Sequence, residues 1–417
     1  MTSEVAVMNS SAVALAADSA VTIGDGKRIY NSALKLFALN YSYPIGIMIY
    51  QGAEFCGVPW ETIIKEYRRD GFEPMGTISE QMTHFLDFVH QNKWVCDDYA
   101  VRETMASLES FLSEVHNSAF NKTINSDDKN YEENFHDCIV GQIEIWNQIQ
   151  PHFCNEAALD DHLAALNELA LPIFQKDESF SQLEDLWQPF LSSWVKYIFS
   201  EDYKFRYSGI VISGFGLDQI LPACVSVEIM TPLHDLRRIR KNTEHEISRE
   251  RRTGVFTFAQ SQATTQTIIG LDAIADQIIT GILHSQYINT VDKVTALIQE
   301  QFAPNEELKS IVDERVAEIC FATLETAQLK IREFTQSNID SFHKTLAYLP
   351  KDEMALVAET LVNLNSFQKK VRGNAETVGG PIDVAVITKG DGLVWMERKH
   401  YFNAKLNPHF NAQYDRV

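Results

Sequence analysis

Three residues near the start of the chain have side chains that together can make a nucleophile: Thr2, Asp18 and Lys35. A threonine hydroxyl becomes a nucleophile when a base takes its proton. The α-amino group of the same residue is such a base, because its pKa of about 7.7–8.0 leaves it partly neutral at working pH. A lysine cation stabilises the developing alkoxide, and an aspartate holds that lysine in place. The set therefore predicts an N-terminal nucleophile at Thr2, once Met1 is removed.

Lys35 is the least expected member of this set, because it interrupts the apolar run over residues 33–39. An unpaired charge is costly to bury in such a segment. We expect Asp18 to be its partner.

The elements that must hold these residues are short strands followed by a helix. Residues 2–8 and 12–17 flank a polar turn, residues 33–39 and 45–50 are strand-like, and residues 58–69 predict a helix with Pro59 and Glu61 in its first turn. Apolar residues at three- and four-residue spacing predict helices within 78–205 and 271–344. Strand character returns at residues 207–214, 221–230, 255–258 and 382–388. We expect the N-terminal strands to pair with residues 207–230 or 382–398.

The segment over residues 235–252 is dense in charges of both signs. Mixed charge of this kind favours a solvated loop or helix face. A basic surface that docks a partner is the alternative.

In order and spacing, several segments resemble the proteasome β-type subunits and the related bacterial HslV peptidase. That family opens with threonine and continues with an A-x-D-S-x-x-T-x-G segment, a lysine on a strand, a small-residue turn, a Gly-Ser-Gly before a helix, and a late glycine pair before a strand. The matching segments here are Thr2, residues 16–24, Lys35, residues 51–53, Gln260-Ser261-Gln262 and Gly379-Gly380.

The resemblance implies an α+β fold, the four-layer αββα sandwich of N-terminal nucleophile (Ntn) hydrolases, enlarged by helical insertions. The core would combine residues 1–77, 206–270 and 345–417, with insertions over residues 78–205 and 271–344. The resemblance also implies site roles. The catalytic residues would be Thr2, Asp18, Lys35 and Ser261; the oxyanion and substrate-binding residues would be Gln51, Gly52 and Thr22; and the accessory residues would be Glu376 and Thr377.

The predicted function is a threonine-type hydrolase that cleaves amide bonds, with peptides as the expected substrates. One alternative is an amidohydrolase of the same fold that acts on a small amide. Another is a non-catalytic, proteasome-like scaffold subunit. Self-association is expected in each case, because proteasome-like folds build rings.

The composition and the absence of certain motifs argue against several other classes of function. A net charge of −21 and a pI near 5.0 argue against binding to nucleic acid or an anionic membrane. No H-E-x-x-H and no G-x-x-x-x-G-K-[ST] occur, so we expect neither a metal nor another cofactor, and any ATPase unfoldase would be a separate protein. The six cysteines form no C-x-x-C pair, which is typical of reduced thiols in the cytoplasm.

Overall fold

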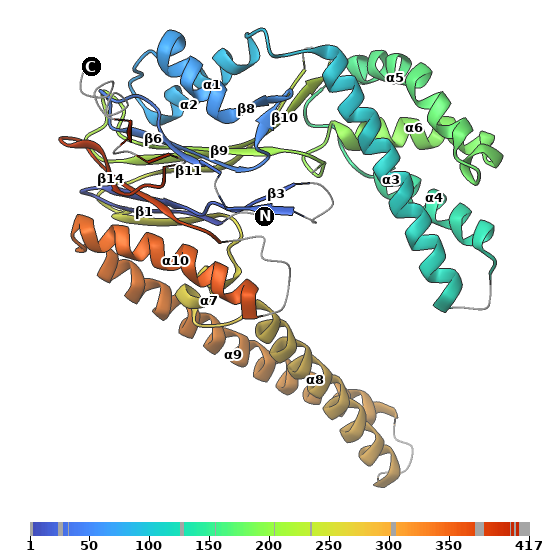
Figure 1. The fold of residues 1–417 in the computed structure, drawn as a ribbon. Helices are drawn as coiled ribbons and strands as arrows, with labels where there is room; N and C mark the ends of the chain where they lie inside the picture. The colour runs from blue at the N-terminus through green and yellow to red at the C-terminus, as the bar shows by residue number, and fades with distance from the viewer. Residues whose placement is uncertain are drawn as a thin grey trace. The chain divides into compact units, whose positions relative to one another are not determined.

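A computed structural model describes residues 3–23, 28–31, 33–125, 129–154, 156–203, 205–233, 236–301, 306–371, 379–400, 402–403 and 406–407. The chain divides into two compact units (Figure 1). Unit 1 combines residues 1–33, 247–388 and 394–416, and unit 2 consists mainly of residues 34–246.

Unit 1 is built on a five-stranded sheet in the order β12-β1-β2-β13-β14. Its strands are β1 (Ser3–Asn9), β2 (Val13–Ala17), β12 (Thr253–Ala259), β13 (Asp383–Thr388) and β14 (Gly392–Glu397). Strand β2 is apolar throughout, β1 is apolar from Val5 to Met8, and both are buried at every position, as expected for central strands. Both pair in antiparallel register with late segments, so that Val5 lies opposite Thr257 and Ala16 lies opposite Val384.

Helix α10 (Lys351–Val371) covers one face of this sheet (Figure 1). Its buried stripe of Ala358, Leu361 and Val362 packs on Val5 and Val7, the β1 residues that face it. Unit 1 also holds a small pair of strands and three further helices. These are β3 (Val21–Ile23), β4 (Arg28–Tyr30), α7 (Gln262–Ile269), α8 (Ala273–Gln301) and α9 (Glu306–Leu346).

Unit 2 has its own five-stranded sheet in the order β11-β10-β9-β6-β5. The strands are β5 (Leu36–Ala38), β6 (Ile45–Gln51), β9 (Ser208–Gly214), β10 (Ala223–Leu233) and β11 (Leu236–Glu246). Helices α1 (Trp60–Glu66) and α2 (Ile78–His90) supply aromatic side chains to the core on one face, where Trp60 and Phe85 join Ile47 and Ile212. Between β6 and α2 lie β7 (Glu54–Phe55), β8 (Val58–Pro59) and a π-helical turn over Tyr67–Gly71.

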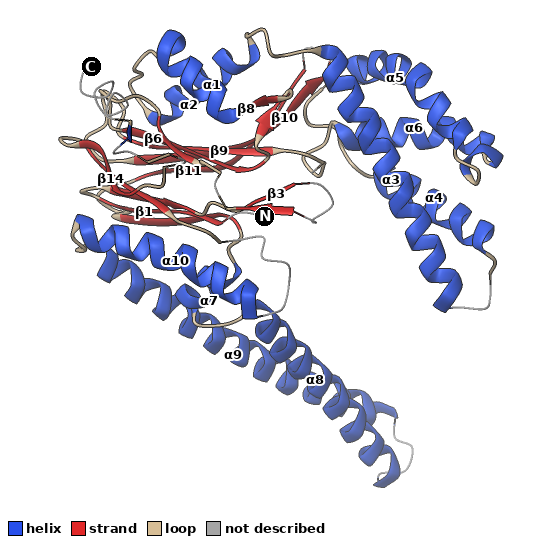
Figure 2. Cartoon of the chain, viewed as in Figure 1, coloured by secondary structure: helices blue, strands red, loops and turns tan. Residues whose placement is uncertain are grey.

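Four helices of unit 2 (Figure 2) supply most of a second core, which Met230 and Leu233 of β10 complete. The four helices are α3 (Asp97–Asn125), α4 (Tyr131–Asn147), α5 (Glu156–Lys176) and α6 (Glu184–Ile198), with a 3₁₀ turn at Phe180–Gln182. Trp146, Phe174 and Trp194 are buried at their centre. Asn130 begins α4 with a capping box to Glu133, which satisfies backbone N–H groups that a helix start leaves free.

The strand pairings expected from the sequence are confirmed: β2 pairs with β13, and β6 pairs with β9. The α+β class with antiparallel sheets is confirmed as well. The division of the sequence into core and insertions stays a prediction. The interpretation of residues 235–252 as a solvated loop or helix face is wrong, because most of the segment is strand β11. Its charges suit an edge strand, whose open side they protect from unwanted pairing.

Within the described ranges, no one helix has the length and apolar character needed to cross a membrane. Helix α7 together with Ile274–Val294 of α8 meets that length and composition test only as a bent pair.

Candidate functional site

Buried polar residues gather in unit 1 where β1 begins. We call Ser3, Asp18, Ser19, Thr264 and Asn365 the β1 cluster; each is at most 3% exposed. They come from four separate parts of the chain, so the fold brings together what the sequence keeps apart.

Asp18 is the centre of the β1 cluster. It directly follows β2, and its side chain accepts hydrogen bonds from three backbone N–H groups. Oδ1 accepts from Ser3 at 3.1 Å, and Oδ2 accepts from Gly379 at 3.0 Å and from Ala20 at 3.3 Å. The backbone N–H of Asp18 in turn donates to the Ser3 carbonyl at 3.1 Å. One carboxylate therefore fixes the start of β1 against the late glycine pair.

Ser19 and the glycine pair lock together beside Asp18. The backbone N–H of Ser19 donates to the Gly379 carbonyl at 3.2 Å, and its hydroxyl donates to the Pro381 carbonyl. Gly380 has φ = 79°, and a Cβ there would lie 2.7 Å from Cβ of Asn31. Only glycine fits this turn without displacing a neighbour.

Asn365 connects the start of β1 to the start of α7. Its Nδ2 group donates to Ser3 Oγ at 2.8 Å, to the Gln260 carbonyl at 2.9 Å and to Thr264 Oγ1 at 3.2 Å. Sequence reasoning missed this residue. The available signal was its place on the buried stripe of an amphipathic helix, four residues after Leu361, where a polar side chain needs partners.

Ser261, the predicted accessory serine, begins α7 and makes no capping hydrogen bond with its side chain. It follows two residues after Ala259, which lies opposite Ser3 and has a left-handed backbone with φ = 65°. Ser261 also lines a cavity of about 740 Å³ among α7, α8 and α9. The structure therefore places Ser261 in the lining of a cavity and within two residues of the strand that pairs with β1.

Three predicted residues belong to unit 2. Lys35 is buried, 4% exposed, and its carbonyl accepts from the N–H of Ile49 at 2.9 Å. Gln51 ends β6 with φ = 65°. The N–H of Gly52 donates to the Tyr207 carbonyl at 3.1 Å. Because Asp18 and Ser261 lie in unit 1, their association with Lys35, Gln51 and Gly52 stays a prediction.

Gly52 is required by its surroundings. A Cβ at this position would lie 2.3 Å from Ser208 Oγ, which donates to the Gly52 and Glu54 carbonyls at 3.2 and 3.3 Å. The small-residue turn after β6 therefore has a packing reason of its own.

The remaining predicted residues are only partly placed or not placed at all. Thr22 lies in β3 opposite Ile29. Thr2, Glu376 and Thr377 lie outside the described residues. Among the residues that the structure does describe, no group of three His, Cys, Asp or Glu side chains is arranged to hold a metal ion.

Two cysteines are poor rivals for the role of nucleophile. Burial raises the pKa of Cys56 and of Cys224 to about 12 in each case. The thiolate is the reactive form of cysteine, and almost none is present at neutral pH with such a pKa.

No protein-family model and no curated protein matches the chain. Solved structures of Anbu (ancestral beta-subunit) proteins are similar over all of this chain. They include Anbu from Yersinia bercovieri, at 9% identity, 97% of that chain and a TM-score of 0.27. The helical assembly of the Anbu complex from Pseudomonas aeruginosa is 9% identical, with 96% of that chain covered and a TM-score of 0.30. The Anbu (Gly-1) mutant from Hyphomicrobium sp. strain MC1 is 9% identical, with 94% of that chain covered and a TM-score of 0.29.

These scores are too low to support an argument about activity. The assignment to the proteasome β-type or HslV-like family is wrong, because no family model matches and the similar structures are Anbu proteins, a distinct family. The short segments that suggested it have local structural reasons. Asp18 ties backbone groups together, and the glycine at position 380 fits a tight turn.

Proposed function

We propose that the protein is an amide-bond hydrolase of the N-terminal nucleophile type, with Thr2 as the nucleophile after removal of Met1. The observation that supports this proposal is the buried Asp18 carboxylate, which holds the N–H of Ser3, the residue after Thr2, beside Gly379. A nucleophile on a rigid, well-hydrogen-bonded strand end keeps its geometry through the reaction.

The proposed reaction begins with attack of Thr2 Oγ on an amide carbonyl carbon. The Thr2 α-amino group, or Lys35, accepts the hydroxyl proton, and Lys35 stabilises the negative charge. The C–N bond then breaks, the leaving amine takes the proton, and an ester remains on Thr2. Water then hydrolyses this ester, and the amino group that accepted the first proton again acts as the base.

Other residues have supporting roles in this proposal. Asp18 orients Lys35, and Ser261 assists beside the nucleophile. Gly52 N–H is the proposed oxyanion donor, although it must then share its hydrogen with the Tyr207 carbonyl. Gln51 and Thr22 would contact substrate. Glu376 and Thr377 would relay protons to the amine.

The proposal includes the four-layer αββα sandwich. Its support is the distribution of apolar residues in both sheets. The strands are apolar on the face that packs on their own helices and also on the opposite face. In unit 1 that face carries Ala6, Met8 and Leu15, which alternate with the residues packed on α10. In unit 2 it carries Met48 and Val211, which alternate with residues packed on α1 and α2. In the proposed sandwich, these two apolar faces would pack against each other and so be buried from water.

Peptides are the proposed substrates, and hydrolysis of a small amide is the alternative. A non-catalytic scaffold remains the other alternative. Self-association, a separate ATPase unfoldase and a cytoplasmic location also stay proposals. The described cysteines, which are all free thiols, are compatible with that location.

Intact-mass spectrometry with a peptide epoxyketone tests the nucleophile. The proposal requires that the mature chain begin at Thr2 and that one inhibitor molecule be added there. Thr2→Ala should abolish labelling and hydrolysis, whereas Thr2→Ser should keep part of both because a hydroxyl remains. The matched control is Thr326→Ala on exposed α9, whose hydroxyl only bonds its own helix at Ala322. Equal labelling of wild type and Thr2→Ala would overturn the proposal.

Two further arms separate the alternatives. Lys35→Ala should slow hydrolysis about 100-fold, as loss of a placed electrostatic donor does. A panel of peptides and small amides then distinguishes peptidase from amidase. If the mature chain begins at Thr2 but shows neither labelling nor hydrolysis, the result would favour the non-catalytic scaffold.

A further inference from the structure

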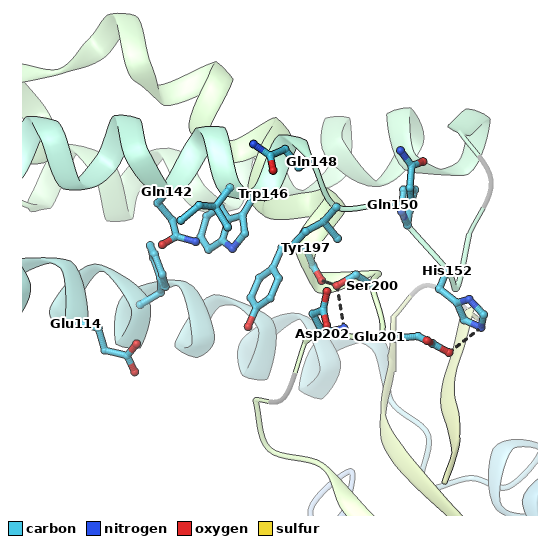
Figure 3. Close-up of a pocket in the computed structure, with 14 residues that line it drawn as sticks. Glu114, Gln142, Trp146, Gln148, Gln150, His152, Tyr197, Ser200, Glu201 and Asp202 are labelled. Carbon is cyan, nitrogen blue, oxygen red and sulfur yellow. Dashed lines mark hydrogen bonds and ion pairs between the residues drawn. The ribbon is translucent and has the colours of Figure 1, made fainter. Parts of the chain in front are cut away.

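A second cavity lies in unit 2, among the helices that supply most of the second core. Its volume is about 850 Å³, within the range of small-molecule and peptide pockets. It lies between α3, α4 and α6 and the segments that follow α4 and α6 (Figure 3). None of the side chains assigned to the candidate hydrolytic site takes part in it.

Aromatic rings form one wall of this cavity. Tyr197 and Trp146 stack with ring centroids 5.1 Å apart and planes inclined by 12° (Figure 3). Phe111 lies against Trp146 at 4.5 Å. Trp146 is fully buried, whereas Tyr197 and Phe111 are half-buried and line the cavity. Tyr197 and Phe111 are therefore the two rings of this wall that are most open to a ligand, and Tyr197 is the one that lies near the carboxylates.

Carboxylates surround this wall. Glu114, Glu201 and Asp202 line the cavity and are exposed, and the amides of Gln142 and Gln148 add further acceptors. In the view of Figure 3, Glu114 and Asp202 lie on opposite sides of Tyr197. No lysine or arginine is among the lining residues, and the one histidine, His152, lies 3.3 Å from Glu201.

The electrostatics agree with this geometry. Burial, followed by the charges of Tyr203, Asp202 and Glu114, raises the pKa of Tyr197. Asp202 and Glu114 thus act on the ring of Tyr197, and the cavity has a negative potential that favours a cation.

We propose that this cavity binds the guanidinium group of an arginine side chain presented by a peptide. The planar cation would stack on Tyr197 and donate to the carboxylates of Glu114 and Asp202. A guanidinium suits the site better than an ammonium because it is flat, weakly hydrated and able to donate from several N–H groups. A peptide suits it better than free arginine, whose α-carboxylate the acidic rim repels.

The same unit already places a guanidinium beside a tyrosine ring. Arg238 lies with its guanidinium carbon 5.3 Å from the ring centroid of Tyr203, which lines a smaller cavity of about 210 Å³. Phe111, Glu114 and Tyr197 line both cavities. The arrangement proposed for the ligand therefore repeats, in the open cavity, a contact that the core beside it contains.

Calorimetric titration of the full chain with N-acetylarginine amide tests the proposal. Its neutral isostere N-acetylcitrulline amide should bind at least about tenfold more weakly, because it lacks the charge that both the ring and the carboxylates recognise. Free arginine should also bind more weakly than the capped form. Equal binding of the arginine and citrulline compounds, or no binding of the arginine compound at millimolar concentration, would overturn the proposal.

Variants separate this site from the general acidity of the protein. The double variant Glu114→Gln/Asp202→Asn should weaken binding about tenfold. Tyr197→Leu, which keeps the charge, should weaken it about fivefold, while Tyr197→Phe should retain it. The matched control is Glu168→Gln, an exposed glutamate on α5 outside the cavity, which should leave binding unchanged. Equal loss in the control and the double variant would show diffuse attraction and would contradict the assignment. Circular dichroism confirms that each variant is folded.

Discussion

Each unit contains a buried charged side chain that hydrogen-bonds to the backbone, but one accepts from N–H groups and the other donates to carbonyl groups. Asp18 of unit 1 is 0% exposed and accepts from the N–H groups of Ser3, Ala20 and Gly379. Arg238 of unit 2 is 3% exposed and donates to the Thr231 carbonyl at 2.7 and 3.1 Å and to the Ile198 carbonyl at 3.3 Å.

The difference lies in what each charge holds. Arg238 connects β10 to the last residue of α6, so it joins elements of the scaffold. Asp18 joins the residue after the proposed nucleophile to the late glycine pair. Burying either charge is costly unless its hydrogen bonds are complete. We infer that both residues stabilise the fold, and that under the proposed function Asp18 also fixes Ser3, the residue next to the nucleophile.

The largest effect is expected from Asp18→Ala. The N–H groups of Ser3 and Ala20, which are buried, and that of Gly379, which is half-buried, would lose their acceptor, which should lower the free energy of unfolding by about 4 kcal/mol. Asp18→Asn keeps one oxygen and should cost roughly half as much. Urea unfolding measures both changes, and epoxyketone labelling of the fraction that remains folded should be lost as well. Asp340→Ala, at an exposed position of α9, is the control and should change stability by less than about 0.5 kcal/mol.

Arg238→Leu should destabilise the protein by about 3 kcal/mol, because the carbonyls of Thr231 and Ile198 would lose a buried donor. Arg238→Lys should recover only part of this, since a lysine cannot reproduce the planar fork of the guanidinium. In contrast to the Asp18 variants, the folded fraction should still be labelled by the epoxyketone. Loss of labelling in folded Arg238→Lys would remove the distinction between the two charges.

Much of the architecture follows from local patterns in the sequence. The apolar runs within residues 2–8 and 12–17 predict strands, and β1 and β2 lie there. Helix periodicity likewise marks α3 to α6. These features depend on neighbours within one element, which is why periodicity reveals them.

Other features depend on contacts that no local pattern contains. Asn365 and Ser3 are 362 residues apart, and only the packing of α10 on the sheet brings them together. Strand β11 was hidden because its charges obscure any alternation, and because one of them, Arg238, points into the core. A buried arginine satisfied by backbone carbonyls leaves no signature in composition.

A smaller, pH-dependent effect should distinguish the histidines of the two units. Burial lowers the pKa of His90 in unit 2, and its ring nitrogen Nδ1 lies 2.8 Å from the Leu86 carbonyl. Nδ1 therefore carries the proton, and protonation of buried Nε2 is disfavoured. The folded state then binds fewer protons than the unfolded state. The stability from His90 is present above its unfolded pKa of about 6.5 and is lost as the pH falls below it.

NMR titration of the ring protons should give a pKa for His90 below the ordinary value. His90→Gln should flatten the fall in unfolding free energy between about pH 7 and pH 5, an effect of about 1 kcal/mol. Burial also lowers the pKa of His343 in unit 1, which is less buried, so its contribution has the same sign and a smaller size. A larger change from His343→Gln than from His90→Gln would contradict this order.

The smallest effect concerns two strained residues, one beside each predicted part of the site. Ala259 precedes Ser261 by two positions, Gln51 precedes Gly52, and both have φ = 65°. A left-handed backbone costs a residue with a Cβ about 1–2 kcal/mol, and glycine removes this cost while adding about 0.5–1 kcal/mol of chain entropy to the unfolded state. Ala259→Gly and Gln51→Gly should therefore each stabilise the protein by about 0.5 kcal/mol in urea unfolding. Ala263→Gly and Gln266→Gly within α7 are the matched controls, and each should destabilise by about 1 kcal/mol. If all four variants lose stability equally, the left-handed backbone is not strained. If Ala259→Gly gains stability but slows labelling of Thr2, the strain beside Ser261 contributes to the site.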